Sequence, residues 1–500
     1  MKLKQNAALL AVLTGLMAVP AATPVAAQTS DLNEMTASEA AEAIRDGKIT
    51  SRALVDALIE KAGANQDLNV FITLDADGAR AAADKADAAV KAGGTLGALH
   101  GVPVVAKDNI NSAGVATTGG TPALKDFVPD ENAPVLQALI DAGAILLAKT
   151  NMHELAFGIT SNNAAYGAVG NPYAPDRFAG GSSGGTGAAV GGRMATVGLG
   201  TDTGGSVRIP AALNGISGLR PTIGRYPADG IVPISHTRDT PGPMARSVAD
   251  LILLDTVITG DDGAVAPASL ADIRLGLAPQ FVGDLDPETK RLFDEAIAAM
   301  KTAGATVVEV DAGTVVDLAG KAGFPLALFE VRGDLDAFVK KYGGAADIGA
   351  VAAGVASPDV KFVFENLVLG DQAVPEPVYR EAVDTLRPQL IAAYETLFTD
   401  NDLDALVFPT TPLPAQPIES SDMNVMLNGK EVPTFQTFIR NTDPGSNAGI
   451  PGLTVPIGLT GDGLPVGIEF DGPAGSDRDL LAIGLATENL VGRLPAPGTE

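Results

Sequence analysis

Two serines set among glycines are the residues of this 500-residue sequence best suited to chemistry. Ser182 lies in the glycine-rich run 180–185, and Ser206 follows the pair Gly204 and Gly205. Glycine loses more backbone entropy on folding than other residues, so such clusters indicate a close approach of backbone to a ligand. A serine beside unpaired backbone N–H groups is placed as a nucleophile next to an oxyanion hole. The pattern therefore predicts nucleophilic catalysis.

The base that would activate such a serine is not an obvious histidine. The chain has only three histidines, and they are far apart in sequence. A Ser–Lys arrangement can replace the histidine, provided that burial keeps the lysine neutral. Lys107 ends the apolar run 102–106, and Lys149 follows a second apolar run at 145–148. The residues alone leave both lysines open as the base.

Other interpretations of the glycine-rich segment fit less well. A phosphate-binding loop needs Lys-Ser or Lys-Thr after its glycines, which is missing here. The pattern Gly-x-Ser-x-Gly occurs at 180–184 and 181–185, but the preceding segment 171–177 is a poor strand and only His236 follows it, as an esterase would require. A flexible linker would not lead into the apolar helix start at 186–190.

Helices alternate with buried strands along the chain, which predicts a large layered α/β fold. Lys107 would stand at the end of its strand, where open α/β sheets build their sites. We expect a helix with a capping box at Thr36 and Glu39, and another capped at Thr50 or Ser51. Further helices are expected over 79–92, 133–141, 287–303 with Asp286 as its cap, and 478–488. Strands are expected over 102–106, 145–148, 306–310 and 405–408, and a hairpin around the glycines of 461–463 should pair 454–458 with 466–470.

Composition excludes several classes of function. The net charge of −26 argues against nucleic-acid binding, which needs clustered Lys and Arg. The chain has no cysteine, so disulfides, thiolate zinc sites and a cysteine nucleophile are impossible. The histidine spacing gives no metal motif. We expect no cofactor and no metal.

The N-terminus has the pattern of an export signal. Lys2 and Lys4 precede the apolar stretch 7–19, which is too short to span a membrane. Small residues at 25–27 then precede Gln28, as at a cleavage site. We predict a signal peptide over 1–27, a catalytic domain over 28–500, a periplasmic location and no membrane attachment after cleavage.

The glycine-serine segment and its surroundings resemble the amidase signature family, and the resemblance covers nearly all of the mature chain. The stretches that carry it are 101–108, 181–185, 200–210, 218–222, 409–412 and 447–452. The resemblance implies a single large α/β/α domain around a mixed, mostly parallel sheet. It also implies hydrolysis of carboxylic amides through an acyl-enzyme.

The resemblance assigns a role to each residue of the predicted site. It implies that Ser206 is the nucleophile, that Ser182, following a cis peptide bond, relays a proton, and that Lys107 is the base, which leaves Lys149 a structural role. The backbone of Thr203, Gly204, Gly205 and Ser206 would form the oxyanion hole, and Ser183, Asp202 and Arg208 would support the site.

Within the family the chain is most similar to indoleacetamide and mandelamide hydrolases, through the stretches 153–163, 235–244 and 440–447. We therefore expect a small aryl- or arylacetamide-type substrate, with Phe157 and His153 as candidate contacts, and a monomer or homodimer. Alternatives are another exported C–N hydrolase such as a peptide amidase, a tRNA amidotransferase subunit, and a non-catalytic binding protein. The segment 313–375 carries no motif.

Overall fold

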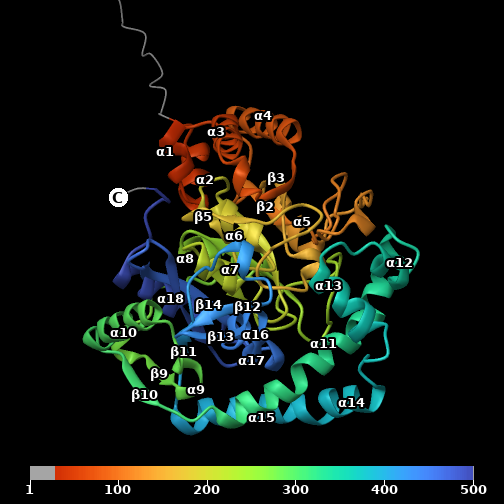
Figure 1. The fold of residues 1–500 in the computed structure, drawn as a ribbon. Helices are drawn as coiled ribbons and strands as arrows, with labels where there is room; N and C mark the ends of the chain where they lie inside the picture. Colours follow the sequence, from red (N-terminus) through yellow and green to blue (C-terminus); the bar gives the residue numbers. More distant parts are fainter. Residues whose placement is uncertain (1–28, 499–500) are drawn as a thin grey trace, which may run out of the picture.

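The computed structural model describes residues 29–498, in which helices surround a central eleven-stranded sheet (Figure 1). The predicted signal peptide lies outside the described residues. In spatial order the strands of the sheet are β1 (Phe71–Leu74), β3 (Ile145–Thr150), β2 (Pro103–Lys107), β6 (Val197–Asp202), β8 (Thr240–Ala245), β7 (Ser217–Arg220), β14 (Gly452–Leu459), β15 (Pro465–Asp471), β11 (Ala405–Pro409), β9 (Arg274–Leu277) and β10 (Thr306–Glu309). Two small two-stranded sheets pair β4 (Gly170–Asn171) with β5 (Ala174–Phe178) and β12 (Asn424–Leu427) with β13 (Lys430–Pro433).

The sheet is mixed, as predicted, with its parallel pairings gathered at two flanks. Strands β3, β2 and β6 run parallel on one flank, and β11, β9 and β10 do so on the other. The remaining six pairings are antiparallel, so the sheet has more antiparallel pairs than we expected. The reason lies partly in the hairpin of β14 and β15, whose short turn forces antiparallel pairing.

The helices begin and end close to the signals in the sequence. Thr36 and Glu39 form the predicted capping box, and Thr50 accepts a hydrogen bond from the N–H of Ala53 as the next cap. The helices are α1 (Thr29–Glu34), α2 (Ala37–Arg45), α3 (Ser51–Ala64), α4 (Ala76–Ala92), α5 (Pro134–Asp141), α6 (Gly184–Gly191), α7 (Arg208–Leu213), α8 (Val248–Thr259), α9 (Pro279–Val282), α10 (Pro287–Thr302), α11 (Gly313–Tyr342), α12 (Ile348–Ala353), α13 (Pro358–Phe362), α14 (Glu376–Glu381), α15 (Arg387–Asn401), α16 (Thr434–Ile439), α17 (Asp443–Ala448) and α18 (Asp477–Val491).

Helices cover both faces of the sheet, as neighbouring residues of β14 show. A Cβ on Gly484 of α18 would lie 2.3 Å from Leu453, whereas one on Gly467 would meet both Thr454 and Ala212 of α7. Successive residues of a strand point to opposite faces, so α18 and α7 lie on opposite sides. The predicted α/β/α layering is confirmed.

The segment 313–375, which carries no motif, folds into helices beside the glycine-rich loops. Its first helix, α11, has 30 residues and lies at the lower right of the view in Figure 1, above α14 and α15. The carbonyl of Gly323 on α11 accepts a hydrogen bond from Arg238 at 2.7 Å. This segment therefore packs against the loop that leads into β8.

Among residues 29–498, no helix combines the length and the apolar character that crossing a bilayer requires.

Candidate active site

Lys107 is the last residue of β2 and is fully buried. Its Nζ lies 2.7 Å from Ser182 Oγ and 2.8 Å from Thr201 Oγ1. Thr201 belongs to β6, the parallel neighbour of β2, so two adjacent strand ends place these groups together. The predicted position of a site at the end of β2 matches this arrangement.

Burial lowers the pKa of Lys107 to about 7, against the opposing effect of the negative charges of Asp202 and Asp239. A lysine amine in water stays protonated to a much higher pH and cannot accept a proton. Near neutral pH a large share of the Lys107 amines is therefore uncharged. The amine can then act as a base toward the hydroxyl that it contacts.

Ser182 is held by its own carbonyl in a tightly packed loop. The peptide bond between Gly181 and Ser182 is cis. The Ser182 carbonyl accepts a hydrogen bond from the backbone N–H of His153 at 3.1 Å. A Cβ on Gly185 would lie 2.3 Å from the carbonyl oxygen of Asn151, so the loop can approach β3 only because glycine stands there. This packing fixes Ser182 beside Lys107.

The loop that ends in Ser206 directs its carbonyls into the protein. The carbonyl of Gly204 accepts from Thr442 Oγ1 at 2.6 Å, that of Thr203 from Arg238 Nε at 3.1 Å, and that of Ser206 from the N–H of Ser183 at 3.2 Å. Ser206 itself is 8% exposed. The loop is thus held in place by hydrogen bonds that its backbone carbonyls accept.

The N–H groups of the same loop are mostly left unpaired. Within residues 29–498, the N–H groups of Thr203, Gly204 and Ser206 donate to no protein acceptor. These three fit the predicted oxyanion hole. Gly205 differs from the prediction, because its N–H donates to Asp202 Oδ1 at 2.9 Å. Its contribution is conformational: at φ +133° a Cβ would lie 2.2 Å from Thr442 Oγ1.

The carboxylate of Asp202, which is fully buried, holds this loop by hydrogen bonds to its backbone. It accepts from the backbone N–H of Val207 at 3.1 Å and contacts the guanidinium groups of Arg208 at 3.1 Å and Arg220 at 2.9 Å. Burial alone would raise the pKa of Asp202, but the two guanidinium groups hold it well below its usual range. Asp202 and Arg208 therefore form a buried ion pair that holds the loop in place.

Arg220 is a supporting residue that the sequence analysis did not single out. Like Lys107 it is a basic residue at the end of a buried strand, here β7, and it is fully buried. Its Nη1 donates to the backbone carbonyl of Asp202 at 2.7 Å as well as to the carboxylate. Its position at the end of a buried strand could have identified it in the sequence. A buried guanidinium group without an anionic partner would be strongly destabilising, so a carboxylate partner is expected there.

Ser183 and α17 complete the support. Ser183 Oγ lies 3.3 Å from both the N–H and the carbonyl of Thr201. From α17, Ser446 accepts from Arg208 Nη2 at 2.6 Å, and Asp443 pairs with Arg238. Residues 440–447, which lie far from Ser206 in the sequence, thus support the Ser206 loop through Arg208 and Arg238.

Lys149, the other candidate base, is directed away from the serines. Its Nζ donates to the carbonyl of Ile110 and to Thr117 Oγ1, each at 2.7 Å, and lies 3.5 Å from Asp108. The structure therefore separates the two lysines that the residues alone could not: Lys107 contacts a serine, and Lys149 ties loops together.

His153 and Phe157 lie in structural positions. His153 Nε2 lies 2.8 Å from Asp359 of α13, and its Nδ1 lies 3.4 Å from Thr160. The ring of Phe157 packs edge-on against Phe364 with centroids 5.3 Å apart. Both side chains thus help to attach the helical segment that follows α11.

A cavity of about 270 Å³ adjoins the site. Its wall includes Thr201, which contacts Lys107, together with Thr203 of the Ser206 loop. Neither His153 nor Phe157 lines it, but their neighbour Ala156 does, and the sequence analysis missed that residue. The other residues of the wall are Asn109, Ala228, Asp229, Ile231, Val232, Pro233, Ile234, His236, Asp239, Thr240, Pro241 and Asp334.

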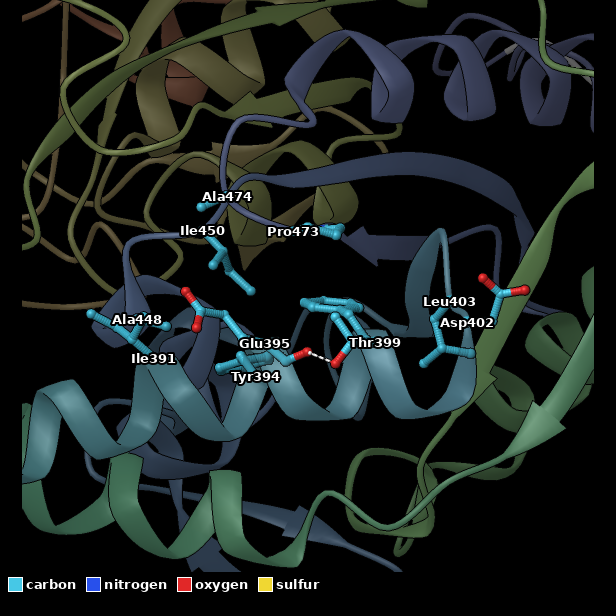
Figure 2. Close-up of a pocket in the computed structure, with 11 residues that line it drawn as sticks. Ile391, Tyr394, Glu395, Thr399, Asp402, Leu403, Ala448, Ile450, Pro473 and Ala474 are labelled. Atoms are coloured by element: carbon cyan, nitrogen blue, oxygen red, sulfur yellow. Dashed lines mark hydrogen bonds between the residues drawn. The ribbon is translucent and has the colours of Figure 1, made fainter.

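A second hollow, about 360 Å³ in volume, lies elsewhere on the molecule. Figure 2 shows its wall, formed on one side by Tyr394, Glu395 and Thr399 of α15 and on the other by Ile450 and its neighbours. It shares no residue with the cavity beside Lys107. The smaller cavity is therefore the candidate substrate site.

His236, on which an esterase triad would depend, is directed toward α11. Its ring Nδ1 lies 2.9 Å from Asp334, and its Nε2 lies 3.7 Å from Glu330. In the described part of the chain, neither nitrogen bonds to Ser182 or Ser206, so the esterase arrangement is absent there. His236, Glu330 and Asp334 have ligand atoms within 4.8 Å of one another, the one such group among the described residues. Glu330 is already hydrogen-bonded to Ser235 and Thr237.

Comparison with known proteins identifies the family of the chain. A family model described as Amidase matches residues 53–481. Mandelamide hydrolase of Pseudomonas putida is 43% identical over 94% of each chain, and indoleacetamide hydrolase of Rhizobium radiobacter is 44% identical over 88% of this chain and 93% of that protein. The crystal structure of peptide amidase from Stenotrophomonas maltophilia is similar with a TM-score of 0.80 and 31% identity, covering 93% of this chain and 98% of that one. The chain belongs to the amidase family and is an amide-hydrolysing enzyme.

Proposed function

We propose that the protein hydrolyses small aryl- or arylacetamide-type amides to an acid and ammonia or an amine, through an acyl-enzyme on Ser206. The observation that carries this proposal is the 2.7 Å contact between the buried Lys107 amine and Ser182 Oγ, beside a loop of unpaired N–H groups. The names of the mandelamide and indoleacetamide hydrolases support the substrate class.

The reaction begins with proton transfer toward Lys107. The neutral amine takes the proton of Ser182, which in turn takes the proton of Ser206 as its Oγ attacks the amide carbon. The tetrahedral oxyanion accepts hydrogen bonds from the unpaired N–H groups of Thr203, Gly204 and Ser206. When the C–N bond breaks, the leaving amine receives a proton from Lys107 through Ser182.

Water completes the cycle by the same route in reverse. It loses a proton toward Lys107 as it attacks the acyl carbon, and Ser206 regains its proton when the acid leaves. The balance is one amide and one water consumed, and one acid and one amine formed.

Ammonia release from a panel of aryl and alkyl amides tests the proposal, with Ser206→Ala and Lys107→Ala assayed beside the mature protein. We expect turnover of the arylacetamides and its loss in both variants. Activity that survives Ser206→Ala would contradict the mechanism. A lack of ammonia release from every amide in the panel would contradict the proposed substrate class.

A second candidate, the hydrolysis of C-terminal peptide amides, draws on the structural similarity to the peptide amidase. Including amidated dipeptides in the same panel separates the two, since the better kcat/KM identifies the class.

We also propose that the enzyme is exported to the periplasm, on the support of the pattern in residues 1–27 alone. N-terminal sequencing of protein from a periplasmic fraction should give Gln28 as the first residue. A retained Met1 would contradict the export.

A further inference from the structure

The wall of the cavity beside Lys107 combines apolar side chains with three carboxylates. Asp229, Asp239 and Asp334 all belong to its wall, whereas none of its lining residues is a lysine or an arginine. The single lining residue that can carry a positive charge is His236. A cavity of this composition favours ligands that are cationic or rich in donors.

At the inner end of the cavity, Asp239 is held in place by three donors. Its carboxylate accepts from Thr203 Oγ1 at 2.6 Å and from the N–H groups of Ile234 at 2.7 Å and Ser235 at 2.9 Å. Burial raises the pKa of Asp239, while these three hydrogen bonds favour its ionised form. The carboxylate thus contacts Thr203, a residue of the loop that ends in Ser206.

At the outer end, two carboxylates face one imidazole. Asp334 Oδ2 accepts from the backbone N–H of His236 at 2.8 Å and lies 2.9 Å from its Nδ1, while the buried Glu330 lies behind the ring. Even a protonated His236 leaves this group with a net negative charge. Asp229 adds a further carboxylate, and its partner Lys341 lies 3.7 Å away in an exposed pair that water screens.

A buried acceptor without a donor supports the same conclusion independently. Asn109 lines the cavity and is only 2% exposed, and its Nδ2 donates to Thr201 at 3.0 Å. Its Oδ1 has no hydrogen-bond partner among the described residues. Buried acceptors are nearly always satisfied in folded proteins, so this oxygen calls for a donor from a ligand.

We propose that this cavity selects amides that carry a positively charged group away from the scissile bond, and that Asp334 is a residue that determines this specificity. The inference rests on the proposed function, because it assigns the cavity to the substrate of Ser206. An anionic substituent at the same place would face Asp239 and Asp334, and it is disfavoured.

Three matched substrates test the selection: 4-(aminomethyl)phenylacetamide, 4-methylphenylacetamide and 4-carboxyphenylacetamide. We expect kcat/KM for the cation to exceed that for the anion by about tenfold at low salt, with the difference shrinking at high salt because the rim charges are screened. Equal values for the cation and the anion, with the neutral amide turned over, would overturn the inference and leave the proposed function intact.

Two variants move the preference in opposite directions. Asp334→Asn removes a carboxylate at the outer end of the cavity. It should reduce the ratio of kcat/KM for the cationic substrate to that for the anionic substrate by about threefold. His236→Gln removes the opposing positive charge and should increase the ratio. Asp402→Asn is the matched control, because it removes one carboxylate from the hollow in Figure 2, where φ is +52° and asparagine is tolerated. A ratio that Asp402→Asn changes as much as Asp334→Asn would reject the assignment to this cavity.

Binding of fragments separates the inference from catalysis. Thermal unfolding of the Lys107→Ala variant can be measured with benzylammonium, benzyl alcohol or benzoate as the added probe. We expect benzylammonium to raise Tm the most, and Asp334→Asn to remove that advantage. If no amide is hydrolysed but this order holds, the proposed function fails and the preference of the cavity for cations stands. If benzoate raises Tm as much as benzylammonium, the preference of the cavity for cations is rejected.

Discussion

The Lys107 amine and the Ser182 hydroxyl lie 2.7 Å apart in a region from which solvent is excluded. Burial removes the hydration of the charged Lys107 amine, and the negative charges of Asp202 and Asp239 offset this loss only in part. The neutral form of the amine is therefore favoured, and the pKa is lowered. The contact therefore pairs a hydroxyl with an acceptor near neutral pH. In this respect the lysine takes the place that histidine holds in the more familiar serine triads.

The pH dependence of kcat/KM should follow the protonation of Lys107. The amine accepts a proton only when it is neutral, and its pKa is about 7. With a neutral substrate, we expect kcat/KM to rise by about tenfold per pH unit below that value and to level off above it. A profile that stays flat from about pH 5.5 to pH 8.5 would exclude Lys107 as the base of the rate-limiting step.

Gly205→Ala should impair catalysis while leaving the fold in place. The residue has φ +133°, and a Cβ would lie 2.2 Å from Thr442 Oγ1, so the loop must shift and carry the Ser206 N–H with it. Misplacing an oxyanion donor lowers kcat by about 10²-fold. Gly63→Ala is the control, because its Cβ would meet nothing within 4 Å and it lies in α3. Equal kcat values for the two variants would contradict the role of this loop.

Several helix starts and one hairpin could be predicted because their signals are local. The capping box of Thr36 and Glu39, the Asp286 cap before Pro287 and the glycine-centred hairpin depend on neighbouring residues, and all three are present. The mix of parallel and antiparallel pairs could not be predicted in this way. It depends on which strands become neighbours, and β8 lies between β6 and β7 although it follows both in sequence.

For the site, the sequence identified residues whose chemistry was unusual for their surroundings. Lys107 at the end of an apolar run was such a residue, and Arg220 was equally available. The cavity wall was harder, because Asn109, Ala156 and Thr201 are ordinary residue types that gain a role only through placement. Likewise, only the structure could show that the Gly205 N–H turns toward Asp202.

Arg220→Met should destabilise the protein far more than the loss of a surface arginine. Asp202 would lose one of its two guanidinium partners while remaining fully buried, which costs about 3–5 kcal/mol of the free energy of unfolding. Arg291→Met is the control, since its ion pairs with Glu288 and Glu295 are exposed and screened by water, so its loss should have a much smaller effect. Urea unfolding of the two variants measures both effects. A similar small loss in each would mean that Arg220 is not needed to hold Asp202.

Lys107→Met and Lys149→Met remove buried amines of the same size and should have opposite consequences. Lys149→Met leaves Asp108 without its cation and Ile110 and Thr117 without their donor, so we expect a loss of about 3–5 kcal/mol in the free energy of unfolding. The molecules that remain folded should keep their turnover, because Lys149 does not contact the serines.

Lys107→Met, in contrast, should abolish hydrolysis without a comparable loss of stability. Its amine has no carboxylate within 4 Å among the described residues, and its two hydroxyl partners are small neutral groups. Replacing a desolvated amine by an apolar side chain of similar length removes the cost of burying that amine. Urea unfolding and ammonia release, measured on the same two preparations, check the pair. If Lys149→Met loses turnover while fully folded and Lys107→Met keeps it, the two lysines have been assigned in the wrong order.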